Sequence, residues 1–179
     1  MESTFIALLR GVNVGKAKRI AMADLRSLIA DLGFADVRTL LNSGNVVFRG
    51  AAKSTPEIAV AIEKAILAKC GFSSRVSVLT AADLARIVDE DPLIDSATDA
   101  ARYLVAVLQD AADLKLLEPI LARDFSPERV ISGTRVVYLW CARGILESGM
   151  LKLIVKCFGE RATTRNWATI CKLSALAKA

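Results

Sequence analysis

The chain has 179 residues, of which 54% are hydrophobic and 24% are charged, and it contains no histidine. The hydrophobic fraction excludes an intrinsically disordered chain. The absence of histidine excludes Ser-His-Asp and Cys-His catalysis and histidine metal sites. The net charge of +5 permits an anionic partner without requiring one.

The cysteines and the apolar segments predict a soluble protein of the cytoplasm. The four cysteines form no C-x-x-C pair and fit no zinc site, which favours reduced, buried thiols. The short apolar run near the N-terminus lacks the preceding basic residues of a signal peptide. No apolar run approaches the roughly 18 residues of a membrane helix, so we expect no membrane contact.

The first half of the chain alternates apolar runs, which predict buried strands, with apolar residues at helical spacing. The predicted strands cover residues 4–9, 37–41, 46–49 and 76–79, and the predicted helices cover residues 22–32 and 54–70. Ser54 and Glu57 have the spacing of a helix-capping pair. The resulting order β-α-β-β-α-β is that of a ferredoxin-like unit.

The second half repeats this plan after a short helix that begins at Thr80 and an acidic linker at residues 89–101. We expect strands at residues 103–108, 130–132 and 135–141, helices at residues 114–121 and 151–158, and a last helix capped by Thr163 or Thr164. The predicted fold is therefore α+β, with two tandem ferredoxin-like (βαββα) subdomains at residues 1–90 and 100–179.

Matching letters support a duplication. The tripeptide Ala-Asp-Leu at residues 23–25 recurs at residues 112–114, and Ser-Gly at residues 43–44 recurs at residues 132–133 with the same offset. The connection from the first strand to the first helix is much longer than its counterpart in the second half. Because connections in such units are normally short, the long loop looks like a functional addition to a repeated scaffold.

That loop begins R-G-V-N-V-G-K-A-K-R at residues 10–19, with four bases and no acid. Glycines let main-chain N–H groups face an anion, and lysine adds a positive charge. The candidate ligand residues here are Arg10, Asn13, Gly15 and Lys16. Only three residues separate the glycines and alanine follows the lysine, which excludes a P-loop. The alternative is a solvated basic loop with turn glycines.

Two further motifs carry candidate ligand residues. Ser43 and Asn45 flank a glycine and are either ligand donors near the basic loop or parts of a hairpin turn. Arg165, Asn166 and Trp167 suit stacking and bidentate contacts to a phosphate or a base, or else form a capped helix start with a packed tryptophan. We predict that the basic loop and these two motifs form one surface.

Three functions remain open from the residues alone. The first is a binding module for an anionic ligand, which would be a nucleotide, a phosphate or a nucleic acid. The second is a small enzyme that acts on a phosphorylated or carboxylate substrate, for which a deep pocket holding Lys16, Ser43 or Arg165 would be evidence. The third is a module that binds a protein partner. The sequence assigns no catalytic residue, no cofactor, no metal ligand and no oligomeric state. Residues 46–48 lack the stacking aromatics of an RNA recognition motif.

The runs A-L-L-R-G-V-N-V-G and S-G-N-V-V-F, together with the tail R-N-W-x-T-x-x-K-L, resemble the bacterial domain-of-unknown-function family 1697. The resemblance covers most of the chain and implies a two-subdomain α+β fold without implying an activity. The chain departs from the family pattern at Lys16, where a second glycine is common, and at Ala168, where asparagine is usual.

Overall fold

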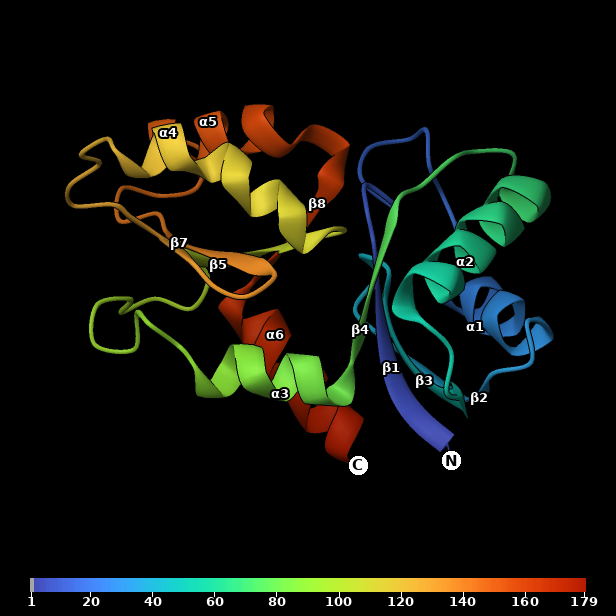
Figure 1. The fold of residues 1–179 in the computed structure, drawn as a ribbon. Coiled ribbons are helices and arrows are strands. Elements are labelled where there is room, and N and C mark those ends of the chain that lie inside the picture. The colour runs from blue at the N-terminus through green and yellow to red at the C-terminus, as the bar shows by residue number, and fades with distance from the viewer. Residues whose placement is uncertain (1) are drawn as a thin grey trace. The chain divides into compact units, whose positions relative to one another are not determined.

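The computed structural model describes residues 2–179 and contains two four-stranded sheets (Figure 1). The chain divides into a first unit, residues 1–85 with 173–179, and a second unit, residues 86–172. The division into subdomains at residues 1–90 and 100–179 stays a prediction.

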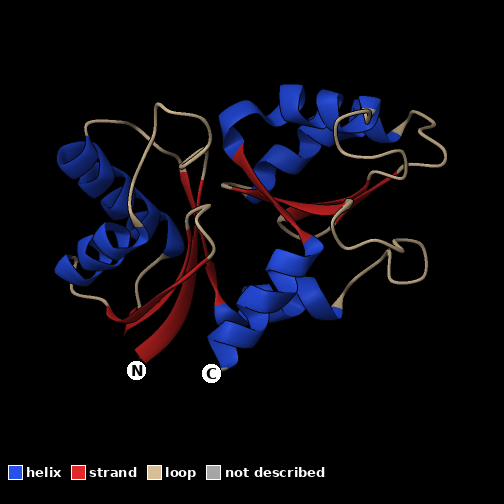
Figure 2. Cartoon of the chain, turned by 180° about the vertical axis from the view of Figure 1, so that it is seen from behind, coloured by secondary structure: helices blue, strands red, loops and turns tan. Residues whose placement is uncertain are grey.

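The first unit has the strand order β2-β3-β1-β4, and neighbouring strands are antiparallel. Its elements are β1 (Glu2–Leu9), α1 (Met22–Asp31), β2 (Ala35–Leu40), β3 (Asn45–Ala51), α2 (Thr55–Cys70) and β4 (Val76–Thr80), followed by the start of α3 (Ala81–Asp89). The two helices α1 and α2 cover one face of the sheet (Figures 1 and 2). Apolar side chains of both helices and of the sheet form a buried core between them.

Local signals in the sequence set the ends of these elements. Ser54 and Glu57 form the predicted capping box, in which each side chain bonds to the other residue's main-chain N–H. Gly71 ends α2 in the left-handed conformation with φ of 73°. Thr80 and Asp83 form a second reciprocal pair at the start of α3, as the sequence predicts.

The second unit has the matching strand order β6-β7-β5-β8. Its elements are β5 (Tyr103–Leu108), the 3-10 helix η1 (Ala111–Leu117), α4 (Glu118–Leu121), β6 (Arg129–Ser132), β7 (Val136–Trp140), α5 (Gly149–Phe158), the 3-10 turn η2 (Gly159–Arg161), β8 (Ala162–Asn166) and the start of α6 (Trp167–Lys178). The equal order of strands in both units confirms two tandem ferredoxin-like folds.

The structure corrects two of the secondary-structure predictions made from the sequence. The predicted helix at residues 114–121 is mostly a 3-10 helix, and only its last four residues form α4. Pro119 stands in the first turn of α4, where proline is favoured because its missing N–H needs no partner there. The prediction that Thr163 or Thr164 caps the last helix is wrong, because both residues lie in β8. The helix begins at Trp167 instead.

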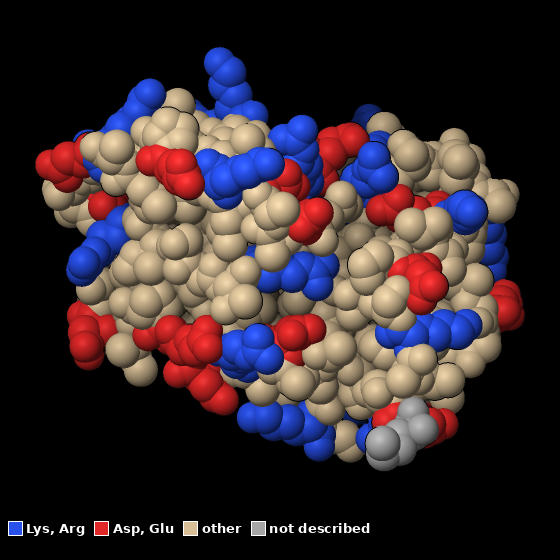
Figure 3. Space-filling model, in the orientation of Figure 1, with Lys and Arg blue, Asp and Glu red and all other residues tan. Residues whose placement is uncertain are grey.

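Acidic and basic side chains are mixed on the face drawn in Figure 3, and no large area of that face carries a single sign of charge. Among the helices of residues 2–179, none is long and apolar enough to cross a membrane.

Candidate functional site

Residues 10–21, called the basic loop below, connect β1 to α1 in the first unit. Asn13 closes this loop. Its Oδ1 accepts a hydrogen bond from the Ile20 amide at 3.0 Å, and its Nδ2 donates to the Ile20 carbonyl at 2.9 Å. Nδ2 also donates to the carbonyl of Asn42 at 2.8 Å, and the Asn13 N–H donates to the Lys18 carbonyl at 2.7 Å. The Asn13 amide therefore orders the loop and ties it to the β2–β3 turn.

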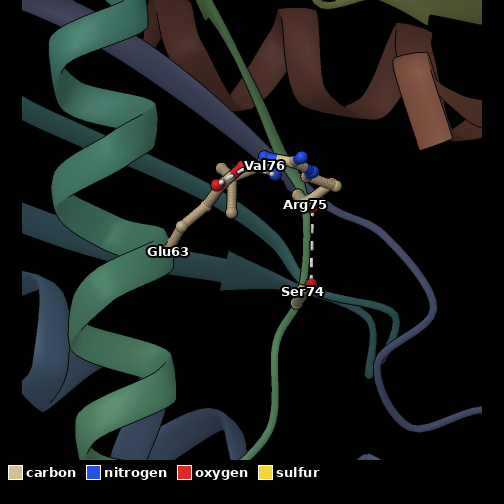
Figure 4. A network of polar contacts seen from close by, with 4 residues as sticks. All are labelled: Glu63, Ser74, Arg75 and Val76. Carbon is tan, nitrogen blue, oxygen red and sulfur yellow. Dashed lines mark hydrogen bonds and ion pairs between the residues drawn. The ribbon is translucent and has the colours of Figure 1, made fainter.

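A network of polar contacts at the start of β4, of which Figure 4 draws Glu63, Ser74, Arg75 and Val76, holds the base of the loop. Ser74 Oγ donates to the carbonyl of Arg10 at 2.9 Å, and the Arg10 N–H donates to the carbonyl of Arg75 at 2.8 Å. From α2, the Glu63 carboxylate accepts from the Val76 amide at 2.8 Å and pairs with the Arg75 guanidinium at 3.3 Å. The point where the loop leaves β1 is thus tied to β4, and β4 is tied to α2.

The turn between β2 and β3 gives its polar groups to the fold. Asn45 is fully buried, and its Nδ2 donates to the carbonyl of Leu40 and to Ser43 Oγ, both at 2.9 Å. Gly44 has φ of 75°, and its carbonyl accepts a hydrogen bond from the Leu9 amide at 2.8 Å. These contacts fit the predicted hairpin turn, and ligand binding by Ser43 and Asn45 stays a prediction. The packing of the turn against β1 also holds Asn42 where Asn13 can reach it.

A pocket of about 770 Å³, called the loop pocket below, lies beside the basic loop within the first unit. Its walls come from the loop, the first turn of α1, the β2–β3 turn and the end of α2. They include the charged residues Arg19, Asp24 and Lys69, the amides Asn13 and Asn42, and the less polar residues Ile20, Met22 and Cys70. The volume lies in the range of about 300–1,000 Å³ that is typical of small-molecule sites.

The charged groups of the loop pocket have no ionic partner in the part of the chain that the structure describes. Among residues 2–179, Arg19, Asp24 and Lys69 take part in none of the ion pairs or side-chain hydrogen bonds. All three side chains are exposed to solvent. The first turn of α1 also reaches the pocket, and its N-cap residue Ala21 provides no side-chain hydrogen bond. The free N–H groups of a first helical turn carry a partial positive charge.

The predicted residues of the first unit divide into three groups. Asn13 lines the loop pocket, although its amide is occupied by main-chain groups. Gly15 and Lys16 are exposed on the loop, and Arg10 is half-buried at its start. None of the three lines the pocket. Ser43 and Asn45 lie in the neighbouring turn, outside the pocket lining. The pocket therefore lacks the Lys16 or Ser43 that would be evidence for an enzyme.

Of the residues that line the loop pocket, only Asn13 is predicted from the sequence as a candidate ligand residue, and Arg19, Asp24, Asn42, Lys69 and Cys70 are missed, among others. Asp24 belongs to the repeated Ala-Asp-Leu motif, which by itself indicates only a duplication. Asn42 stands in a stretch whose composition predicts a hairpin turn. Lys69 and Cys70 end α2, far along the chain from the loop, and no local pattern in the sequence connects them with it.

The third predicted motif lies in the second unit and is occupied by internal contacts. Arg165 is in β8, where its Nη1 donates to the Thr164 carbonyl at 2.9 Å, and burial lowers the pKa of its guanidinium to about 10. Asn166 caps α6, because its Oδ1 accepts from the Thr169 amide at 2.9 Å. Trp167 stacks on Tyr103 with ring centroids 4.7 Å apart. The predicted single surface combines residues of both units and stays a prediction.

The two tyrosines of the chain provide a test of the second unit's core. Both are buried, which raises the pKa of Tyr138 to about 12. Burial raises the pKa of Tyr103 as well, and so does its hydrogen bond of 2.7 Å to Asp91. We expect no tyrosinate absorbance in the folded protein near pH 10, where a free tyrosine is about half ionised.

The free energy of unfolding should depend on pH through the same two tyrosines. Because the folded state keeps both phenols neutral, their contribution is complete below about pH 10 and is lost as the pH rises from there through 12. An ultraviolet pH titration with circular dichroism on the same samples measures both effects. Tyrosinate that forms near pH 10 while the circular dichroism stays native would contradict this prediction.

Residues 2–179 contain no group of three or more acidic, cysteine or histidine side chains that could hold a metal ion. The four cysteines are free. Cys141 is buried, whereas Cys70, Cys157 and Cys171 are half-buried. Cys70 alone among them lines the loop pocket, which makes its thiol a local reporter of occupancy.

Comparisons with known proteins agree with this fold. A family model described as "Protein of unknown function (DUF1697)" matches residues 2–138. Among solved structures, the chain is similar to the conserved bacterial protein SP0830 from Streptococcus pneumoniae. The TM-score is 0.82, with 22% sequence identity over 99% of each chain. At this identity, the similarity shows the fold alone. No curated protein matches the chain.

Proposed function

The chain belongs to the DUF1697 family, whose function is unknown, and from that premise we propose that it binds a small anionic ligand in the loop pocket. The observation that carries this proposal is the pair of cations, Arg19 and Lys69, which face a pocket of small-molecule size without an ionic partner among residues 2–179. An anion would form the ion pairs that these two cations lack among the described residues.

The surroundings of the two cations support the same ligand class. The first turn of α1 adds the partial positive charge of its N–H groups. Exposed Lys16 and half-buried Arg10 lie on the same loop and raise the positive potential near the pocket. The Asn13 contacts keep the loop ordered, so less conformational entropy is lost when a ligand binds.

The location of the protein is part of this proposal. The four thiols are free, as is typical of proteins in a reducing compartment. This supports the cytoplasmic location that the sequence predicts, where phosphorylated small molecules are accessible.

A second candidate, binding of a protein partner, is favoured by two exposed apolar side chains. Val14 is 72% exposed and Leu41 is 55% exposed, and their loops are joined by the bond from Asn13 to Asn42. Leu41 also holds φ of 58°, which is unusual for leucine. In this alternative, a variant with serine at both positions loses a partner that the wild-type chain captures, while anion binding persists.

The first experiment measures alkylation of Cys70 with and without inorganic phosphate, using mass spectrometry of the peptide that carries it. Tryptophan emission is less direct, because Trp140 and Trp167 both belong to the second unit. We expect phosphate to slow alkylation of Cys70 and to leave Cys171 unaffected. The protection should weaken as salt is added, because exposed cations are screened.

Two variants on one helix provide the matched comparison. Lys69→Gln removes a cation from the loop pocket, and we expect it to weaken phosphate protection by about tenfold, as the loss of one charge-assisted hydrogen bond does. Lys64→Gln removes an exposed lysine of α2 that does not line the pocket, and it should bind as the wild type does. Equal behaviour of the two variants would refute the proposal.

A further inference from the structure

The loop pocket has a third charged group that a simple anion does not need. Asp24 stands in the first turn of α1 and lines the same pocket as Arg19 and Lys69. Like them, it has no ionic or hydrogen-bonded side-chain partner among residues 2–179. The pocket thus presents two unpaired cations and one unpaired carboxylate.

An ionised carboxylate accepts hydrogen bonds and donates none. Asp24 therefore attracts hydroxyl or amino groups of a ligand and repels a second anionic group. A polyphosphate or a nucleic-acid backbone would bring several anionic groups close to it. This carboxylate disfavours both of those ligands in the loop pocket.

The two cations and the volume describe the rest of the ligand. A phosphate monoester carries a charge of about −1.5 to −2 at neutral pH, which matches two cations better than a single carboxylate does. The pocket of about 770 Å³ has room for an organic body beside the phosphate group. Ile20, Met22 and Cys70 offer that body a less polar wall.

We infer that the loop pocket selects a small phosphate monoester that carries hydroxyl groups, with the phosphate at Arg19 and Lys69 and a hydroxyl at Asp24. This inference rests on the proposed anion site and adds a specificity-determining residue to it. It sets the ligand class apart from free phosphate, polyphosphate and nucleic acid.

Asp24 has a competing structural role, because a carboxylate in a first helical turn also stabilises the helix dipole. Selectivity must therefore be measured separately from stability. Asp31→Asn is the matched control, since it removes an exposed carboxylate from the other end of α1, outside the pocket lining.

The experiment compares ribose 5-phosphate, inorganic phosphate and tripolyphosphate as probes, by calorimetric titration and by protection of Cys70. We expect the full chain to bind ribose 5-phosphate about tenfold more tightly than inorganic phosphate, the effect of one added hydrogen bond to a charged group. Asp24→Asn should reduce this preference and strengthen the binding of tripolyphosphate. Asp31→Asn should change neither.

The possible outcomes distinguish a failure of the proposed anion site from a failure of the monoester inference. If no probe binds, the anion site itself is wrong. If inorganic phosphate binds as tightly as ribose 5-phosphate, or if Asp24→Asn leaves the preference unchanged, anion binding stands and the monoester inference is wrong. A thermal melt of each variant shows whether the variant is folded. A folded Asp24→Asn with altered preference assigns the carboxylate to the ligand.

Discussion

Replacing Gly44 by alanine is expected to lower the free energy of unfolding by about 3 kcal/mol, as the combined cost of overpacking and of left-handed strain. Gly44 has φ of 75°, which L-residues rarely adopt. An added Cβ would lie 2.6 Å from Val12 Cγ2 and 2.7 Å from Leu9 Cβ, closer than van der Waals contact permits. Urea unfolding followed by circular dichroism measures the change.

Gly71→Ala is the control for the Gly44 prediction. Gly71 has nearly the same φ, 73°, but an added Cβ there meets no atom within 4 Å. The free energy of unfolding of Gly71→Ala should therefore fall only by the cost of the left-handed backbone conformation, about 1 kcal/mol. Equal losses in the two variants would mean that Val12 and Leu9 move aside without cost, contrary to the tight packing of the turn against β1.

The second large effect is expected from Asn13→Ala. The substitution removes three hydrogen bonds between the Asn13 side chain and main-chain groups of Ile20 and Asn42. It also places alanine at φ of 57°. Because these bonds are partly exposed, we expect a loss of about 2 kcal/mol. The Ile20 amide, which donates to Asn13 Oδ1, should exchange its hydrogen faster.

Phosphate binding should weaken together with loop order in Asn13→Ala. Asn13→Gly removes the same side-chain bonds without the left-handed strain, so it should recover about 1 kcal/mol of stability and still expose the Ile20 amide. An Asn13→Ala chain that keeps its Ile20 protection but loses phosphate binding would show that the amide contacts the ligand directly. That result would support the sequence prediction over the positioning role.

The missed strand β8 shows why local patterns fail at some elements. Thr163 and Thr164 are good helix caps and also β-branched residues that favour strands. Their pairing with Val107 and Ala106 of β5 makes this segment a strand and not a helix start. A local pattern does not show this pairing, because the partner residues are distant in the sequence. The internal repeat contained the missing information, because a second ferredoxin-like unit needs a fourth strand equivalent to β4.

The sequence by itself determined the features that depend on near neighbours. Apolar periodicity, the capping pairs at Ser54 and Thr80 and the turn glycines act over a few residues, so they predicted most elements and, through the repeat, the two tandem folds. The sequence also located the basic loop, because a long connection stands out against its short counterpart in the second half.

Only the tertiary structure decided which residues form the pocket. Lys69 and Cys70 reach the loop because α2 and α1 pack on the same face of the sheet. Asn13 and Asn45, which stay predicted ligand residues, bond to main-chain groups that folding brings within reach. Side-chain amides serve a ligand and a backbone equally well, so their role depends on which partner the packed chain places within about 3 Å.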